Sequence, residues 1–206
     1  MSLSISFGLP EQQRSAAATL YWQAFGDKLQ PILGPAPRAC AHFERVMQLD
    51  HCFAAQRGTA LVGIIGFQSG KGNFAGGSAQ QFRASFGKAR ALWSLPVLQW
   101  IGGPPPAKGA LMIDGFSVAP AERGKGIGSA LLAKLREHAK LSGFDTLQLD
   151  VTGNNPRARA FYERGGFYVQ SVRTIGPLSM VMGFGHVLRM RCDLPRDQGS
   201  IGPNLG

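Results

Sequence analysis

The chain has 206 residues, of which 44% are hydrophobic and 17% charged, and its formal net charge at pH 7 is +10. This length suits one domain with a substantial core, and no run reaches the roughly 18 apolar residues of a membrane span. The basic residues are spread along the chain rather than gathered in a stripe with stacking aromatics, so nucleic acid is not expected as the main partner.

The cysteines Cys40, Cys52 and Cys192 are too few and too scattered for a disulfide framework or a zinc site. The four histidines form no cluster with metal-ligand spacing, so no metal is predicted. Residues 1–4 lack the charged and apolar regions of a secretory signal. Reduced thiols without such a signal predict a cytoplasmic protein.

The first third of the chain predicts alternating strands and helices. Ala17, Leu20 and Tyr21 recur at helical spacing and indicate the first helix. The Arg57-Gly58 pair is a hairpin signal between two strands. The expected elements are a strand over 3–7, a helix over 11–25 ended by Pro31, Gly34, Pro35 and Pro37, a helix over 38–49, and strands over 51–56 and 59–67.

A long segment, 68–106, separates these strands from the next one. Phe82, Phe86, Ala89 and Trp93 recur at spacings of four, three and four residues, which predicts one amphipathic helix. An insertion of this length in a compact domain is often functional. Three interpretations stay open: a helix packed on its own core, a lid over a binding pocket, and a contact in a homodimer. A membrane-surface helix is less favoured because the segment has few lysines and arginines.

A glycine-rich turn joins a strand predicted over 111–118 to a helix predicted over 129–141. Its sequence is Arg123-Gly124-Lys125-Gly126-Ile127-Gly128. Such a turn leaves backbone N–H groups unpaired at the positive end of the helix dipole, which favours a phosphate or pyrophosphate ligand. Glycine is needed there because side chains would keep the backbone from closing on the oxygens.

The known phosphate-binding loops narrow the choice of ligand. A P-loop requires Ser or Thr after Gly-Lys, but Gly126 follows Lys125 here. A dinucleotide-binding loop requires a third glycine where Leu131 stands, although Asp150 near the end of the next strand keeps that interpretation open. A glycine-rich turn that binds no ligand also stays open.

A second motif, 155–167, has the pattern of a short capped helix. Asn155 suits the N-cap, Pro156 the first helical position, and Gly165 or Gly166 the C-terminal end. The flanking segments predict a strand over 146–151, two closing strands over 168–175 and 186–194, and a disordered tail over 195–206.

Both motifs also match patterns of one family. Arg123, Gly126 and Gly128 fit [RQ]-x-x-G-x-[GA], and residues 155–167 fit N-x-x-A-x-x-[FL]-Y-E-[KR]-x-G-F. Together and in this order they resemble the GNAT (general N-acetyltransferase) superfamily of acyl-coenzyme A-dependent N-acyltransferases. The resemblance implies a single α/β domain over 1–194. Its GNAT fold would be a mixed, mostly antiparallel, splayed sheet flanked by helices, with 68–106 as a helical insertion between the third and fourth strands.

The resemblance also implies a function. The chain would transfer an acetyl group from acetyl-coenzyme A to a primary amine of an unidentified small-molecule or peptide acceptor, by direct attack in a ternary complex. The residues that the resemblance implies for coenzyme binding are Phe116, Ser117, Val118, Arg123, Gly124, Lys125, Gly126, Ile127, Gly128, Ser129, Asn155 and Ala158.

Two residues are candidates for the chemistry. An alkylamine with a pKa of about 10.4 must lose a proton before it attacks a thioester, and a carboxylate can accept that proton. Strand alternation places Asp114, Phe116 and Val118 on one face, where Asp114 is the ionisable group, and the resemblance implies that it is the base. Tyr162 matches the family's usual general acid. Gly115 is expected to mark a bulge that splays the strand.

Two other functions stay open at this point. One is a non-catalytic module that binds acyl-coenzyme A or a protein partner. The other, less favoured, is a dinucleotide-dependent oxidoreductase. The identity of the acceptor, the oligomeric state and the role of the 68–106 insertion do not follow from the sequence.

Overall fold

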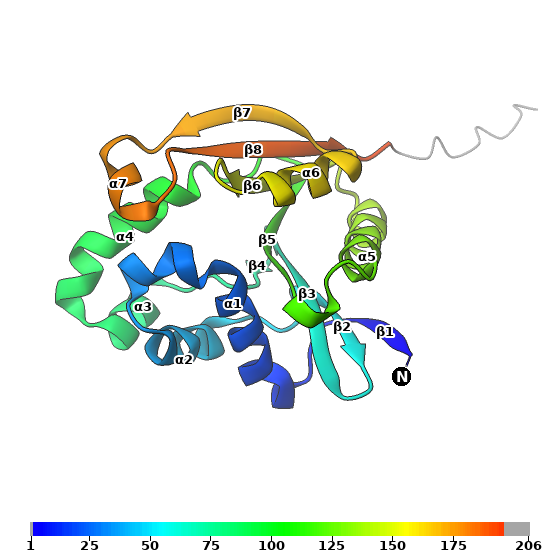
Figure 1. The fold of residues 1–206 in the computed structure, drawn as a ribbon, viewed down its shortest axis with the longest axis horizontal. Helices are drawn as coiled ribbons and strands as arrows, with labels where there is room; N and C mark the ends of the chain where they lie inside the picture. The colour runs from blue at the N-terminus through cyan, green and yellow to red at the C-terminus, as the bar shows by residue number, and fades with distance from the viewer. Residues whose placement is uncertain (1, 196–206) are drawn as a thin grey trace, which may run out of the picture.

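The computed structural model describes residues 2–195, which form one mixed sheet with helices on both faces (Figure 1). Among these residues the sheet has eight strands in the order β1-β2-β3-β5-β6-β8-β7, and β4 pairs with β3 outside this path. Only β5 and β6 pair in parallel within the described part of the chain. The predicted fold, a single α/β domain on a mostly antiparallel sheet, is therefore confirmed.

The strands and helices follow each other along the chain much as the hydrophobic pattern predicts. The strands are β1 (Leu3–Phe7), β2 (Cys52–Arg57), β3 (Ala60–Ser69), β4 (Gly72–Asn73), β5 (Ala110–Val118), β6 (Thr146–Thr152), β7 (Tyr168–Thr174) and β8 (His186–Asp193). The helices are α1 (Arg14–Leu33), α2 (Ala36–Val46), α3 (Ala79–Phe86), α4 (Lys88–Gly102), α5 (Ile127–Leu141), α6 (Pro156–Arg164) and α7 (Ser179–Met182). Short 3-10 turns are η1 (Glu11–Gln13), η2 (Pro120–Glu122) and η3 (Gly176–Leu178).

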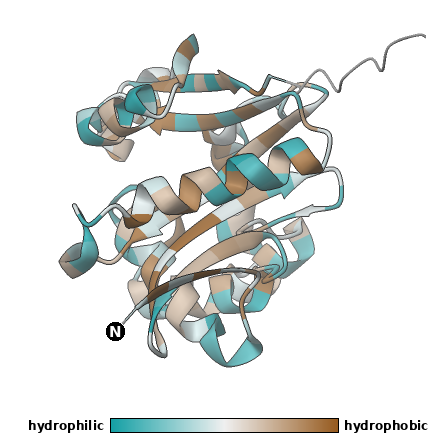
Figure 2. Ribbon diagram, turned by 90° about the vertical axis from the view of Figure 1, so that its right-hand side faces the viewer, coloured by the Kyte–Doolittle hydropathy of each residue, from teal (hydrophilic) through white to brown (hydrophobic). Residues whose placement is uncertain are grey.

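The sheet separates two hydrophobic cores, because successive side chains of a strand point to opposite faces. On β6, for example, Leu147, Leu149 and Val151 are all buried against α5 and α6. Figure 2 looks onto the face that α5 crosses. The other core lies under α1, α2, α3 and α4 and also takes in Met182 of α7 and Phe184. The two cores place the N-terminal helices and the glycine-rich turn on opposite sides of one sheet.

The first helix runs further than its sequence predicts. Pro31 was expected to help end it after Phe25, but Pro31 lies inside α1, which continues to Leu33. Proline costs a helix one backbone hydrogen bond, a loss that burial of Ile32 and Leu33 offsets. The helix then ends at Gly34, whose positive φ of 84° suits glycine.

The insertion differs from the single amphipathic helix predicted for it. Gly87 adopts φ of 84° and divides the segment into α3 and α4, so the apolar spacing does not continue across it. Phe82 and Phe86 are buried in the core, whereas Ala89 and Trp93 are exposed. The prediction failed because the spacing of apolar residues does not reveal a glycine with positive φ, which ends one helix and starts the next in another direction.

The C-terminal end of the insertion is tied to the last two strands of the sheet. Near its C-terminal end, Arg173 of β7 donates to the carbonyls of Trp100 and Ile101, at 2.5 and 2.6 Å. Arg189 of β8 donates to the carbonyl of Pro104 at 3.1 Å. Together with the burial of Phe82 and Phe86 of α3 and of Ala91 of α4, these bonds make the insertion an integral layer of the domain. The lid and dimer interpretations remain untested.

The predicted disordered tail, 195–206, lies outside the described residues except for Pro195. Within residues 2–195, no helix combines the length and the apolar character needed to cross a bilayer. The same residues contain no group of three or more His, Cys, Asp or Glu side chains arranged to hold a metal ion.

The packing of α2 against α3 makes stability depend on pH. The ring of His42 lies among Phe43, Phe82 and Phe86 and hydrogen-bonds to Ser85 at 2.8 Å. Burial, with a smaller contribution from repulsion by a nearby arginine, lowers the pKa of His42 to about 4 from 6.5. Between these two pH values the unfolded chain binds a proton that the folded chain does not.

We therefore expect stability to fall as the pH drops from 6.5 towards 4, with at most ~3 kcal/mol coming from His42. Urea unfolding of wild type and His42→Gln at several pH values measures this. The variant should lose less stability than the wild type over that window. Parallel pH curves for the two proteins would show that His42 titrates normally.

Candidate active site

The sheet opens between its two parallel strands. β5 and β6 are paired only at Ala110↔Thr146, Leu111↔Leu147 and Met112↔Gln148. Beyond these pairs, β5 continues alongside β3 and β6 alongside β8. The β6-facing edge of residues 113–118 therefore has no strand partner among the described residues. Apart from the carbonyl of Val118, which accepts from Arg123, backbone groups of this edge can bind another molecule.

A bulge at Gly115 accompanies this opening. In the β3–β5 ladder, Ile65 pairs with Phe116 but Phe67 pairs with Ile113, so Asp114 and Gly115 together face one residue of β3. Gly115 has φ of 112°, and a Cβ on it would lie 2.6 Å from the ring of Tyr21. The predicted bulge is confirmed, and only glycine fits this position.

The bulge corrects one prediction about the strand. Asp114 was expected to share a face with Phe116 and Val118. Instead, Phe116 and Val118 pack on the core under α5 and α6, whereas Asp114 lies on the side of α1. The extra residue of the bulge reverses the alternation beyond it. The side chain of Asp114 and those of Phe116 and Val118 are thereby directed to opposite faces of the sheet.

The carboxyl group of Asp114 is buried, and it is hydrogen-bonded to the backbone that follows β4. Its Oδ2 accepts a hydrogen bond from the N–H of Ala75 at 3.1 Å. Burial raises the pKa of Asp114, and the amides of Ala75 and Phe74 oppose that rise only partly. A carboxylate with a raised pKa is a stronger proton acceptor than an exposed one.

Tyr162 lies on the other face of the sheet, on α6. Its ring packs against Phe116, Phe161 and Phe167, with centroid distances of 6.1, 5.3 and 5.6 Å. Burial raises the pKa of Tyr162, so its hydroxyl keeps its proton at neutral pH. Among the described residues nothing hydrogen-bonds to this hydroxyl, which leaves its proton free for a ligand. Phe116 thus brings the opened strand and Tyr162 together.

The glycine-rich turn forms the start of α5. Gly124 and Gly126 both have φ of 79°, and Gly126 is the N-cap without a side-chain capping bond. Within the described chain, no partner is found for the amides of Ile127, Gly128 and Ser129, the first helical residues. They form an uncapped helix N-terminus, which is the arrangement that binds phosphate.

The side chains of this turn differ in availability. Arg123 donates to the carbonyl of Val118 at 3.0 Å, which ties the turn to the end of β5. Lys125 is half-exposed and pairs with Glu122 at 3.1 Å. The side chain of Ile127 is buried, so only its backbone amide can face a ligand.

The remaining predicted contact residues have structural bonds of their own. Asn155 caps α6, with its Oδ1 accepting from the N–H of Ala158 at 3.1 Å, which leaves its amide NH₂ group for a ligand. The hydroxyl of Ser117 is buried and donates to the carbonyl of Leu20 at 2.9 Å. Ser117 can therefore contact a ligand only through its backbone.

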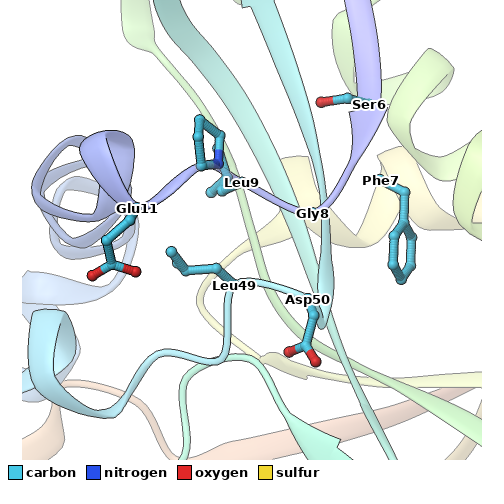
Figure 3. A pocket seen from close by; sticks show the side chains of 8 residues that line it. Ser6, Phe7, Gly8, Leu9, Glu11, Leu49 and Asp50 are labelled. Carbon is cyan, nitrogen blue, oxygen red and sulfur yellow. The ribbon is translucent and has the colours of Figure 1, made fainter.

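Two surface cavities lie away from these residues. One, of about 560 Å³, is lined by residues around Gly8 and by Leu49 and Asp50 (Figure 3). Its carboxylates are already engaged, Glu11 by Arg14 and Asp50 by His51. The other, of about 670 Å³, lies against α4. Neither contains a predicted site residue, so the opening between β5 and β6 remains the candidate site.

Comparison with known proteins identifies the family. The acetyltransferase (GNAT) family matches residues 16–167, which is most of the chain. The chain belongs to this family. The resemblance inferred from the two motifs is thereby confirmed, together with the enzyme class, acyltransferase.

Individual relatives agree with this assignment. Mycothiol acetyltransferase from Beutenbergia cavernae is 38% identical over 74 residues, which is 36% of this chain. The chain thus spans only 24% of that protein's length. An N-acetyltransferase structure from Staphylococcus aureus Mu50 has a TM-score of 0.63 at 18% identity, covering 95% of this chain and 100% of that one. The ribosomal-protein-S18-alanine N-acetyltransferase from Escherichia coli has a TM-score of 0.57 at 16% identity, covering 100% and 99%. These structural likenesses show the GNAT fold.

The acidic residue on which a dinucleotide interpretation depends is already engaged. Asp150 forms a bidentate ion pair with Arg189, at 2.7 and 2.8 Å. A carboxylate bound in this way is not available to a ribose hydroxyl. Together with the GNAT family match, this rules against dinucleotide binding.

Sequence reasoning missed the residues that surround Asp114. Tyr21 has its pKa raised by burial and by the nearby Asp114 carboxylate, yet its spacing on α1 indicates only core packing. Phe74 and Ala75 lie about forty positions before Asp114 in a segment without periodicity. No local signal connects them with Asp114, because the contact exists only once the sheet has formed.

The burial of Asp114 predicts a cost in stability at neutral pH. A carboxyl group with a raised folded pKa binds more protons folded than unfolded, so stability falls as pH rises through that window. Asp114→Asn removes the charge and keeps an oxygen for the N–H of Ala75. We expect its melting temperature at pH 7 to equal or exceed that of wild type.

Asp150→Asn is the matched control for this comparison. It breaks the ion pair with Arg189 and should cost about 1–3 kcal/mol. Thermal unfolding at pH 7 measures both variants. A clear loss of stability in Asp114→Asn would mean that the charged carboxylate stabilises the fold.

Proposed function

We propose that this protein is an N-acetyltransferase that transfers an acetyl group from acetyl-coenzyme A to a primary amine by direct attack in a ternary complex. The observation that carries the proposal is the opening between β5 and β6. It has a desolvated carboxylate on one face of the sheet and a protonated phenol on the other. Membership of the acetyltransferase (GNAT) family supports the same reaction class.

The residues around the opening suit the donor substrate. The uncapped start of α5 offers the amides of Ile127, Gly128 and Ser129 to a pyrophosphate, and Lys125 adds a positive charge beside them. The free edge of β5 at residues 116–118 offers backbone groups to the amide-bearing arm of a coenzyme. We propose Asn155 and Ala158, at the start of α6, as further contacts with the same ligand.

Asp114 is proposed as the base. It lies on the α1 face, where an acceptor would approach the opening, and takes one proton from the attacking amine, directly or through one water molecule. The amine nitrogen then forms the new bond to the acetyl carbonyl carbon. The N–H groups of the free β5 edge are placed to stabilise the charge that develops on the carbonyl oxygen.

Tyr162 is proposed as the acid on the opposite face. As the carbon–sulfur bond breaks, its phenol proton goes to the leaving thiolate, and exchange with solvent restores it. After the carbon–nitrogen bond forms, the nitrogen loses its second proton to solvent. Loss of the proton from Asp114 to solvent then closes the proton balance. Burial keeps the phenol of Tyr162 protonated for its step. Asp114 accepts its proton as a carboxylate, whose proton affinity burial raises.

The pyrophosphate contact can be tested with two lysines that differ only in place. Lys125 in the turn and Lys134 on α5 have side-chain exposures of 52% and 51%, and each pairs with a glutamate three residues away. Calorimetric titration with acetyl-coenzyme A should show about 3- to 10-fold weaker binding for Lys125→Gln, an effect that shrinks at high salt. Lys134→Gln should bind like wild type. Equal affinities for the two variants would contradict the contact.

The acid role can be tested by removing one oxygen. Tyr162→Phe should lower kcat about 100-fold while the affinity for acetyl-coenzyme A stays close to that of wild type. Because the hydroxyl has no protein partner among the described residues, the melting temperature should change little. Unaltered kcat would exclude the acid role.

The proposed function itself is tested by thiol release. Wild-type protein and acetyl-coenzyme A are incubated with panels of small amines, amino acids and peptides, and free coenzyme A is measured. Turnover with an amine that Asp114→Asn and Tyr162→Phe both reduce would support the proposal. Tight binding of acetyl-coenzyme A without turnover on any panel would favour a non-catalytic binding module.

A further inference from the structure

The segment that opens the 68–106 insertion lies directly over the bulge of β5. The side chain of Phe74 is fully buried, and its ring lies 6.3 Å from that of Tyr21. A Cβ on Gly66 of β3 would lie 2.3 Å from this ring, and one on Gly115 of β5 would lie 3.6 Å away. Two glycines facing one aromatic ring mean that Phe74 fills the space which missing side chains leave beside Asp114.

The backbone of the same segment contacts the carboxyl group. The N–H of Ala75 donates to Oδ2 of Asp114 at 3.1 Å, and the amide of Phe74 further favours the charged form. Phe74 thus packs its ring beside the bulge, and its backbone amide partly stabilises the charge of Asp114. Burial of the carboxyl group raises the pKa of Asp114, whereas the hydrogen bonds from these amides lower it.

The segment is anchored on both sides. The N–H of Asn73 donates to the side chain of Gln48, and the N–H of Gln48 donates to the carbonyl of Phe74, both at 3.0 Å. Phe74 also donates to the carbonyl of Phe67 on β3 at 3.1 Å. The side chain of Asn73 accepts from the N–H of Gly76 at 2.8 Å. These hydrogen bonds tie Asn73 and Phe74 to Gln48 and to β3.

We propose that residues 73–75 are the positioning device for the Asp114 carboxylate, with Phe74 excluding water from it and the N–H of Ala75 fixing its orientation. The inference rests on the proposed function, in which Asp114 accepts the amine proton. It assigns a role to the start of the insertion that neither a lid nor a dimer contact would require. Phe74 and Ala75 are positioning residues, since they act through Asp114.

No charged group among the described neighbours of Asp114 accounts for the shift of its pKa. From α1, Tyr21 faces it with a phenol that burial keeps protonated. From β3 the neighbour is Gly66, and from the segment after β4 the neighbours are Phe74 and Ala75. No charged side chain contributes to the shift of the Asp114 pKa among the described residues. The proton affinity of Asp114 is therefore controlled by burial and by these amides.

Two substitutions should move the titration of Asp114 in opposite directions. Phe74→Ala admits water and should lower the pKa of the carboxyl group by about one pH unit. Ala75→Pro removes the N–H donor and should raise it by about half a pH unit. Phe86→Ala is the matched control, because Phe86 is another buried phenylalanine of the same insertion that packs on Phe82 and His42 instead.

Two measurements separate this inference from the proposed function. Carboxyl ¹³C NMR, with the signal assigned through Asp114→Asn, follows the titration of Asp114 without any need for activity. The acid limb of the pH profile of kcat/KM follows it during turnover. Opposite shifts for Phe74→Ala and Ala75→Pro in both measurements, with none for Phe86→Ala, are the expected result. If Phe74→Ala does not fold, the shift of the Asp114 titration in Ala75→Pro tests the inference by itself.

An unchanged NMR titration in the folded variants would overturn the inference, whatever the activity. A shifted NMR titration with an unmoved acid limb would support the positioning of the carboxylate but overturn the role of Asp114 as base. Equal shifts in Phe86→Ala would mean that general loosening of the insertion, rather than this segment, controls Asp114.

Discussion

The structure depends on the early end of pairing between β5 and β6. The strands share three residue pairs and then follow different partners, β3 and β8, so each keeps a satisfied ladder on its outer side only. Leaving one strand edge unpaired inside a sheet is costly unless something else binds there. The bulge at Gly115 makes this possible, because it bends β5 away and directs Asp114 and Phe116 to opposite faces. The glycine-rich turn, Asp114 and Tyr162 all take their places relative to this opening.

The 68–106 insertion extends the N-terminal core across the opened end of the sheet. Its first residues lie over the bulge, and its last helix is held by Arg173 and Arg189 from the two C-terminal strands. Where β5 and β6 separate, the two halves of the sheet share no ladder hydrogen bonds. Contacts outside the sheet that join the two halves therefore stabilise the domain. The insertion therefore links the two halves of the opened sheet, and Ala75 near its start contacts Asp114.

Both ionisable groups proposed for the reaction are unfavourable to the fold in their charged forms. Burial raises the pKa of Asp114 and of Tyr162, which means that the protein holds a carboxyl group and a phenol where ionisation costs free energy. Such shifts are typical of functional sites, although structural networks produce them as well. Asp150, on the neighbouring strand, provides the contrast, because its carboxylate forms an ion pair with Arg189.

The sequence by itself determined the family, the order of the elements and the two motifs. Each of these depends on residues close together in the chain: a capped helix, a glycine turn before a helix, and alternating strands. It also located the bulge, since glycine inside a strand is a local signal. Only the tertiary structure decided which face Asp114 occupies, where Gly87 divides the insertion, and that Phe74 and Ala75 contact a residue about forty positions away. The reason is physical: one extra residue in a bulge reverses every later side chain, and long-range contacts leave no periodicity in the chain that makes them.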